Sequence, residues 1–351
     1  MTARHERLLL VSPAFHGYHQ SIAAGFSAIG YEVVTHCYDR YSTVRMKLRN
    51  KVALELPERI GLDRSAARQQ WDTQRALEAL REARPDRLLV IKGDSLGEAF
   101  WAEAAARGIP TMLWMYDDLH RHDYSLDFLR RIGPVISYAR SEVAQLTGEG
   151  VRAHYLPNGY DPDLAHPSAQ RSGEIVFVGS RYPNRVELME ALVEAGLPVR
   201  AYGRQWSHHP VDRLRTWEVS RPRVPAERDV PLERAYQIQA AAAAAINVHG
   251  LQAGLAMRTF EVPGMGGLQL IDRPDVEEFY EPGREVLVFT STEELTEICR
   301  RVVAEPTWGE TIRTAGRRRS AAEHTFTHRA RTADQWWDLS LIHISEPTRP
   351  Y

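Results

Sequence analysis

Residues 258–267 read Arg-Thr-Phe-Glu-Val-Pro-Gly-Met-Gly-Gly, and residues 268–272 follow as Leu-Gln-Leu-Ile-Asp. The pattern predicts a short helix, a glycine-rich turn and a buried strand, which is one step of a parallel α/β sheet. The carboxylate on this helix, Glu261, can accept hydrogen bonds from ribose hydroxyls, while bare glycine backbone can approach a diphosphate. Alternatively, Gly264, Gly266 and Gly267 serve only the tight turn from helix to strand.

The same alternation of short apolar runs and helical stretches fills both halves of the chain. Runs of this kind are typical of parallel sheets covered by helices on both faces. We expect strands at 8–11, 32–36, 87–91, 111–115 and 134–138, then at 174–178, 199–202, 244–248, 268–271 and 286–289. Asn158-Gly159, followed by Asp161-Pro162, indicates a linker. The sequence therefore predicts two doubly wound α/β domains, residues 1–158 and 159–338.

A set of short motifs resembles one known family. The motifs are Leu156–Gly159, Phe177–Arg181, Pro183–Arg185, Ile246–His249, Met257–Gly264, Gly267–Arg273, Glu281–Gly283 and Glu323–Thr325. Together they resemble the CgeB-like (spore maturation protein) glycosyltransferases, strongly from Leu156 to Arg331 and only in general terms before that. The resemblance implies a GT-B fold, in which two Rossmann-like domains face a central cleft. It also implies an N-terminal acceptor-binding domain and a C-terminal sugar-nucleotide-binding domain that ends in a helix.

Composition agrees with a large soluble enzyme. The 351 residues are 43% hydrophobic, and 44 basic residues nearly balance 46 acidic ones. This balance gives no general basic field, so we expect no nucleic-acid partner. Cys37 and Cys299 lie far apart in apolar contexts, which favours free thiols in a reducing cytoplasm. The first apolar run, Leu8–Val11, is too short for a signal peptide or a membrane span.

Two segments stand apart from the α/β pattern. Residues 339–351 resemble the translation of a transposase-type sequencing adapter, so we expect a non-native tail there and a natural chain that continues beyond Asp338. The alternative is a genuine tail. Residues 41–68 are polar and weakly periodic, and they form either an insertion that contacts the acceptor or a surface helix.

Several residues of the second domain follow strands at the edge where such sheets bind ligands. Gly179 and Arg181 follow one strand and Arg185 opens the next helix, so either arginine can pair with donor phosphates. The alternative is a capped helix with solvated arginines. Gly203 follows another strand and permits a base or sugar to approach. The nearby Trp206 either stacks on the donor or is a packed surface tryptophan with no role in binding.

Two further donor-site candidates flank the opening motif. His249 resembles, by position, the loop that meets the donor, although a structural histidine is the alternative. Arg258 precedes Glu261 by one helical turn and can reach a pyrophosphate. Related retaining enzymes carry a second glutamate eight positions before the ribose-binding one, where this chain has Ala253. The resemblance therefore supports Glu261 as the ribose anchor and leaves the stereochemical outcome open.

The first domain offers candidates for the acceptor side and for catalysis. Gly17 lies in the turn after the first strand, and His19 is a candidate base. Asp94 and Asp117 end two other strands, where a carboxylate can accept a proton. Asp118 is an acceptor-side candidate, with helix N-capping as the alternative for it or for Asp117.

Histidines in the first domain raise the question of a metal. His16 and His19, or His120, His122 and Asp123, lack a defined pair of helical ligands and a cysteine partner. GT-B enzymes generally stabilise the leaving diphosphate with helix dipoles and cations, so the resemblance implies no catalytic metal and no cofactor.

These observations lead to one hypothesis and two alternatives. We expect a cytoplasmic glycosyltransferase that moves a sugar from a nucleoside-diphosphate sugar to a hydroxyl acceptor such as a carbohydrate, in surface-polysaccharide or spore-coat glycosylation. A sugar-nucleotide epimerase or phosphorylase of the same fold would turn over without an acceptor. A non-catalytic coat or polysaccharide-assembly protein would tolerate replacement of His19, Asp94 and Asp117.

Overall fold

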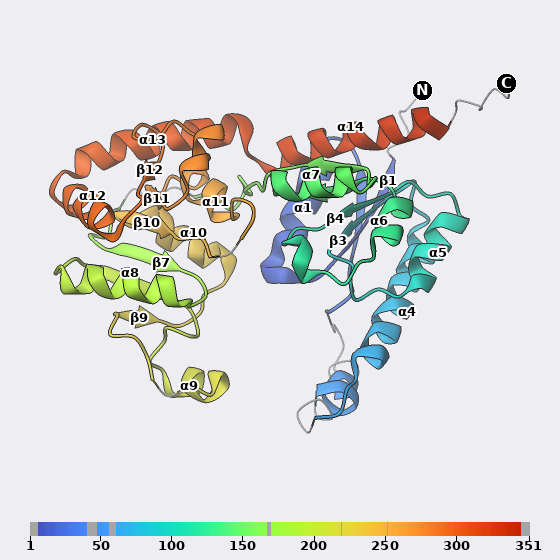
Figure 1. Ribbon diagram of the computed structural model, residues 1–351, viewed down its shortest axis with the longest axis horizontal. Coiled ribbons are helices and arrows are strands. Elements are labelled where there is room, and N and C mark those ends of the chain that lie inside the picture. The colour runs from blue at the N-terminus through green and yellow to red at the C-terminus, as the bar shows by residue number, and fades with distance from the viewer. Residues whose placement is uncertain are drawn as a thin grey trace. The chain divides into compact units, whose positions relative to one another are not determined.

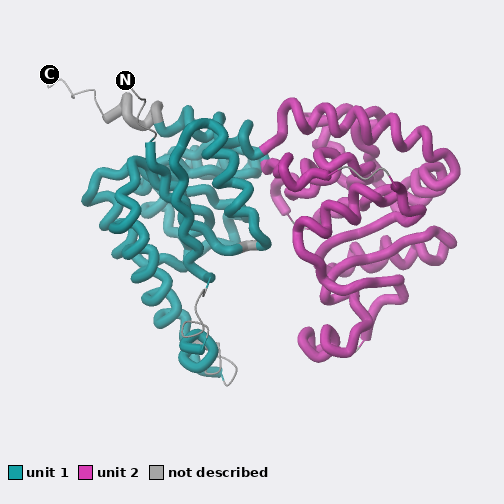
Figure 2. Tube along the Cα trace, turned by 180° about the vertical axis from the view of Figure 1, so that it is seen from behind, with its two compact units in different colours: residues 1–157, 326–351 teal, residues 158–325 magenta. Residues whose placement is uncertain are grey.

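The computed structural model describes residues 6–40, 48–55, 61–166, 170–218, 220–250 and 252–344 (Figure 1). The chain forms two compact units (Figure 2). Unit 1 consists of residues 1–157 and 326–351, and unit 2 of residues 158–325. Each unit is an α/β structure and is described by itself.

Unit 1 is built on a six-stranded sheet of order β2-β1-β3-β4-β5-β6, parallel throughout. Side chains of Leu8 to Val11 in its first strand are completely buried, as expected for a strand covered on both faces. One face packs on α4, α5, α6 and α7, and α1 lies against α14. The strands are β1 (Arg7–Ser12), β2 (Glu32–Cys37), β3 (Arg87–Ile91), β4 (Thr111–Trp114), β5 (Val135–Ser137) and β6 (Ala153–Tyr155). The helices are α1 (Tyr18–Ser27), α4 (Ser65–Ala83), α5 (Glu98–Ala106), α6 (Leu126–Ile132), α7 (Arg140–Gly148) and α14 (Phe326–Ile344).

Unit 2 repeats the plan with a parallel sheet of order β12-β11-β10-β7-β8-β9. Its core holds Phe177, Ile246 and Leu270 from central strands against α8, α12 and α13, while α10 and α11 pack with Val176 and Ala245. The strands are β7 (Ile175–Val178), β8 (Val199–Tyr202), β9 (Ala226–Glu227), β10 (Ala244–Asn247), β11 (Gln269–Ile271) and β12 (Leu287–Val288). The helices are α8 (Pro183–Glu194), α9 (Pro210–Thr216), α10 (Leu232–Ala241), α11 (Arg258–Gly264), α12 (Thr292–Ala304) and α13 (Pro306–Glu323).

The predicted strands are all present, within one or two residues of the predicted bounds. Two further strands, β6 and β9, were not predicted. Each lies at the edge of its sheet and has only three or two residues. Short edge strands are covered on few sides, so they lack the apolar run that reveals a central strand. The predicted doubly wound parallel architecture is confirmed.

The C-terminal helix belongs to a different unit from the one predicted. The sequence analysis assigned it to the second domain, but α14 packs on α1 of unit 1. Trp337 is completely buried, with its ring 5.8 Å from that of Phe26 and 6.3 Å from that of Tyr31. A Cβ atom at Gly25 would lie 2.7 Å from the carbonyl oxygen of Phe326, so the two helices pack with their backbones close together. Aromatic packing between residues far apart in the chain places α14 in unit 1. The local spacing of apolar residues predicts a helix but does not show which unit it packs on.

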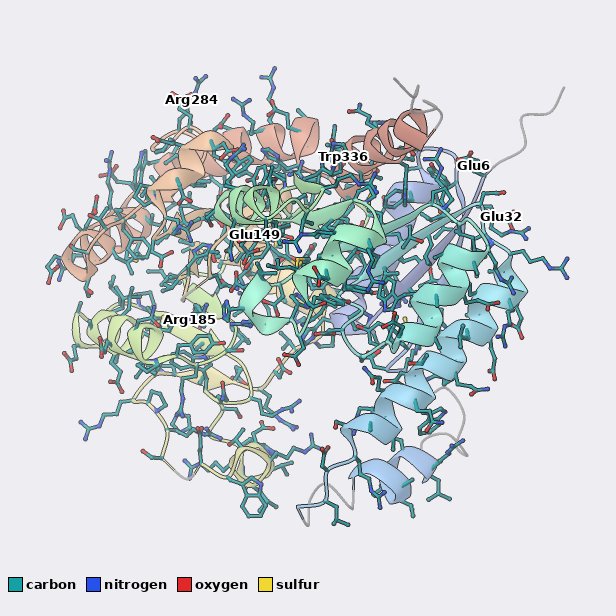
Figure 3. The ribbon with its side chains drawn as sticks, turned by 45° about the vertical axis from the view of Figure 1, so that its right-hand side comes forward. Glu6, Glu32, Glu149, Arg185, Arg284 and Trp336 are labelled. Carbon is teal, nitrogen blue, oxygen red and sulfur yellow. The ribbon has the colours of Figure 1, made fainter. Side chains whose placement is uncertain are left out.

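Replacing Trp337 by alanine is expected to destabilise the protein by about 3–5 kcal/mol, because it removes a large buried side chain and leaves a cavity. The measurement is the urea unfolding midpoint. Trp336 is the matched control: it lies on the same helix (Figure 3), is only half-buried and stacks on His154 at 4.6 Å between ring centroids. Equal losses from the two substitutions would contradict the packing described for α14.

Three other expectations concern the segments outside the α/β pattern, the two cysteines and membrane-spanning helices. Residues 41–47 and 56–60 of the polar segment lie outside the described residues, as do residues 345–351 of the suspected tail. Cys37 and Cys299 are free, as predicted. Within the described ranges, no helix is long and apolar enough to cross a membrane.

Candidate functional site

The carboxyl ends of parallel strands meet at one edge of a sheet, which is where such sheets bind ligands. In unit 2 the loops after β7, β8, β10 and β11 contact one another at this edge. The amide of Asn184 donates to the carbonyl of His249 at 3.0 Å, which ties the start of α8 to the loop after β10. The loops after β7 and β8 meet through Gly179 and Gly203. The edge is therefore one connected set of loops.

A close approach to the backbone of Gly179 requires glycine at residue 203. A Cβ atom at Gly203 would lie 2.7 Å from the carbonyl oxygen of Gly179, so no other residue fits without movement. The same oxygen accepts a hydrogen bond from the indole of Trp206 at 3.0 Å. Trp206 is only 1% exposed and its ring lies 5.6 Å from that of Phe177. The packing alternative therefore describes Trp206, whose ring is not available to stack on a base.

Arg258 is the cation that the structure leaves available at this edge. A Cβ atom at Gly179 would lie 3.0 Å from Nη2 of Arg258, so the absence of a side chain at residue 179 makes room for the guanidinium. Arg258 is half-buried. Among the residues that the structure describes, it has no hydrogen-bond acceptor and no carboxylate within ion-pair distance. A partly desolvated guanidinium beside bare backbone is suited to bind a phosphate.

Arg185, in contrast, uses its donors within the protein. It projects from α8 (Figure 3) and is 6% exposed. Nε and Nη2 donate to the carbonyl of Val248 at 3.0 and 2.6 Å, and Nη1 donates to the carbonyl of Ser180 at 2.9 Å. Burial lowers the pKa of Arg185 to about 10, and the neighbouring Arg258 adds to the shift. Arg185 thus connects the loop after β7 with the loop after β10. The sequence predicted instead that it pairs with donor phosphates.

Arg181 also has a partner of its own. Its Nη2 lies 2.7 Å from Oε2 of Glu218, in a half-exposed ion pair. The backbone N–H of Arg181 donates to the amide oxygen of Gln205 at 3.2 Å. A phosphate would have to compete with Glu218 for this guanidinium. Donor binding by Arg181 stays a prediction.

His249 is held by both ring nitrogens. Nδ1 lies 2.8 Å from Oδ1 of Asp272, and Nε2 accepts a hydrogen bond from the backbone N–H of Ala256 at 3.0 Å. Because Nε2 accepts, the neutral ring carries its proton on Nδ1 and donates it to Asp272. The backbone N–H of His249 donates to the same carboxylate. This geometry matches the structural alternative for His249, which shapes the loop that leads to Arg258.

Asp272 was not among the predicted site residues. It follows the buried strand β11 directly, at the end of the stretch 268–272. Its position after a strand was a usable signal, but its partner is 23 residues earlier in the chain and only the fold reveals it.

Glu261 lies on α11, one turn after Arg258, and is 3% exposed. Its Oε1 accepts a hydrogen bond from the hydroxyl of Tyr236 on α10 at 3.0 Å. Tyr236 was not predicted as a site residue, because an isolated tyrosine on an amphipathic helix carries no local signal of a buried partner. The pair fixes the direction of the Glu261 carboxylate.

The glycines after Glu261 have structural reasons to be glycine. A Cβ atom at Gly264 would lie 2.6 Å from the ring of Tyr160. Gly266 has a φ of 81°, the left-handed conformation that ends a helix. A Cβ atom at Gly267 would lie 3.0 Å from the carbonyl oxygen of Val262. The tight turn accounts for Gly266 and Gly267 and packing against Tyr160 accounts for Gly264, and direct contact with a donor stays a prediction.

In unit 1, Asp94 and Asp117 lie beyond the ends of neighbouring strands and share the cation Lys92. Nζ of Lys92 lies 3.4 Å from Oδ2 of Asp117. Oδ2 of Asp94 lies 3.3 Å from Nδ1 of His122. Burial raises the pKa of Asp94, but His122 and Lys92 together outweigh it and leave this pKa below its usual value. Lys92 and Tyr116 have φ values of 60° and 62°, strained conformations for residues with side chains.

The other predicted residues of unit 1 lie in two further settings. His19 is 6% exposed, burial lowers its pKa, and its charged neighbours are Arg40 and Asp39. Gly17, with a φ of 95°, precedes the helix that carries His19. Asp118 is completely buried and accepts a hydrogen bond from the hydroxyl of Tyr138 at 2.6 Å. It occupies an N-cap position but makes no side-chain cap, so the capping alternative does not describe its contacts.

Metal binding was the remaining alternative for the histidines of unit 1. In the part of the chain that the structure describes, no three His, Cys, Asp or Glu side chains form a group suited to hold a metal ion. Catalysis without a metal or cofactor stays a prediction.

Comparison with known proteins identifies a domain in the second half of the chain. Residues 181–335 match a family model described as glycosyl transferase-like. The chain carries a glycosyl transferase-like domain. Spore protein CgeB of Bacillus subtilis (strain 168) is 22% identical over 221 residues, which are 56% of this chain and 66% of CgeB. The predicted resemblance to the CgeB-like glycosyltransferases is confirmed.

Solved structures confirm the fold of this glycosyltransferase-like chain. Sucrose-phosphate synthase from Thermosynechococcus elongatus superposes with a TM-score of 0.63 at 14% identity, covering 97% of this chain and 100% of that one. HepE from Anabaena, solved in complex with UDP and glucose, has a TM-score of 0.59 at 12% identity, covering 94% and 99%. The predicted GT-B fold is thereby confirmed.

Proposed function

We propose that this protein transfers a sugar from a nucleoside-diphosphate sugar, most specifically a UDP-sugar, to a hydroxyl acceptor. The observation that carries the proposal is the half-buried Arg258 guanidinium, without a protein partner in the described ranges, beside Gly179 and one turn before the buried Glu261. A cation and a carboxylate one helical turn apart match the two ends of a ribose–diphosphate unit. HepE, similar in fold, was solved with UDP-glucose.

In this proposal unit 2 holds the donor and unit 1 provides the acceptor side. Asp94 and Asp117, with Lys92 between them, are the residues that accept hydrogen bonds or a proton from the acceptor hydroxyl. The match to spore protein CgeB supports a role in spore-coat or surface-polysaccharide glycosylation, inside the cytoplasm where sugar nucleotides are made. The reaction proceeds without a metal ion.

Replacing Glu261 by glutamine is expected to weaken UDP binding by about tenfold, because a neutral amide accepts a weaker hydrogen bond from the ribose than a carboxylate does. The measurement is calorimetric titration with UDP and with 2′-deoxy-UDP. We expect the wild type to prefer UDP and the variant to lose that preference. Tyr236→Phe is the matched control, since it removes only the partner of Glu261.

Three outcomes would count against the proposal. Failure of the wild type to bind UDP, GDP, dTDP or their common sugars would remove the donor assignment. Conversion of a bound sugar nucleotide without any acceptor would favour the epimerase alternative. Full activity after replacement of both Asp94 and Asp117 would contradict their acceptor-side role.

A further inference from the structure

Helix α9 exposes its apolar side chains and buries a polar one. Val211 and Leu214, three residues apart on α9, are 42% and 69% exposed, and Trp217, which directly follows the last helical residue, is 87% exposed. Residues at this spacing lie on one side of a helix. The buried residue of α9 is Asp212, at 2%. An ordinary surface helix has the reverse arrangement.

Polar contacts hold the helix in this orientation. Asp212 accepts hydrogen bonds from Arg228 at 2.8 and 3.1 Å. At the other end, Nη2 of Arg221 donates to the hydroxyl of Thr216 at 2.6 Å. The helix lies in the connection between β8 and β9 and projects from the edge of unit 2 (Figure 1). The exposure of the apolar side thus follows from a fixed polar anchor on the opposite side.

The surroundings of α9 are basic. Residues 204–229 contain six arginines and four carboxylates, in a chain whose net charge is −2. Arg228, Arg221 and Arg204 pair with those carboxylates. Within the described ranges, Arg213, Arg215 and Arg223 have no carboxylate within ion-pair distance. An apolar ridge therefore stands among uncompensated positive charges.

We propose that α9 and its arginines dock unit 2 on an anionic lipid surface. Tryptophan and aliphatic side chains insert at the boundary between headgroups and acyl chains, and arginines pair with lipid phosphates. Three apolar side chains are too few for a stable protein interface, which takes about 800 Å² from each partner, but they suffice for an interfacial anchor that charge reinforces. This inference does not rest on the proposed function.

The test is co-sedimentation of the full chain with vesicles of phosphatidylglycerol and phosphatidylcholine, and with phosphatidylcholine alone. We expect binding to the anionic vesicles that weakens as salt is raised. The double substitution Leu214→Ser and Trp217→Ser should lower the partition coefficient by about tenfold or more. Val303→Ser is the matched control, because Val303 is 41% exposed and lies on α12, outside residues 204–229. It should bind like the wild type.

A second variant covers the case in which the double variant misfolds. Arg215→Glu changes an exposed residue and should lower binding to the anionic vesicles by about fivefold or more while leaving the thermal midpoint unchanged. The inference is overturned if the wild type does not co-sediment with anionic vesicles, or if the double variant binds them as well as the wild type does.

Discussion

Replacing Arg258 by alanine is expected to weaken binding of UDP by about 10- to 100-fold while leaving the unfolding midpoint close to that of the wild type. The affinity falls because a charge-assisted hydrogen bond to phosphate contributes about 1.5–3 kcal/mol. The fold is spared because Arg258 has no hydrogen-bond or ion-pair partner among the described residues, so its removal leaves no protein group unpaired. Calorimetric titration of UDP and urea unfolding measure the two effects.

The comparison of ligands makes the Arg258 experiment specific. If the guanidinium binds the diphosphate, the variant should lose affinity for UDP but little affinity for uridine. Arg258→Lys should restore part of the UDP affinity, because an ammonium keeps the charge and loses the two-pronged geometry. Equal UDP affinity in the wild type and the alanine variant would contradict the assignment.

Replacing Arg185 by alanine is expected to have the opposite profile, with a loss of about 2–4 kcal/mol in the free energy of unfolding. Its guanidinium donates to the carbonyls of Val248 and Ser180 from a buried position. A buried acceptor left without its donor costs about 1–3 kcal/mol. The urea unfolding midpoint measures the loss.

Arg204 is the matched control for Arg185. Its side chain is 51% exposed and it lies 3.7 Å from Asp229 in a surface ion pair, so Arg204→Ala should change stability by less than about 0.5 kcal/mol. If Arg185→Ala instead unfolds like the wild type and binds UDP weakly, Arg185 is the phosphate ligand expected from the sequence. The variants of Arg258 and Arg185 thus distinguish a residue that binds the donor from a residue that stabilises the fold.

Sequence patterns predicted the architecture well because they report burial. Central strands such as β1 and β3 are covered on both faces, so each appears as a continuous apolar run. The short edge strand β9 has no such run, and it was missed. The helix α14 was recognised as a helix but assigned to the wrong unit, since its partners Phe26 and Tyr31 lie some 300 residues away in the chain.

In the candidate site, too, local sequence patterns predicted one part and only the fold shows the other. A position after a strand identified Arg181, Arg185 and His249 together, because parallel strands bring such residues to one edge, and Arg258 was identified by its place one helical turn before Glu261. The sequence could not show which of these side chains are occupied by other protein groups. Hydrogen bonds to Val248 and Asp272 occupy Arg185 and His249, and the space left by Gly179 admits Arg258.

The sequence by itself determined the α/β class, the two parallel sheets, the loops that gather at their carboxyl edges and the resemblance to the CgeB-like glycosyltransferases. These follow from the spacing of apolar residues, glycines and short motifs, which are local properties. Only the tertiary structure decided that Arg258 is left without a protein partner in the described ranges, which unit α14 completes and which side of α9 faces solvent. Those outcomes depend on contacts between residues distant in the chain, where burial and hydrogen bonding distinguish side chains of the same chemical type.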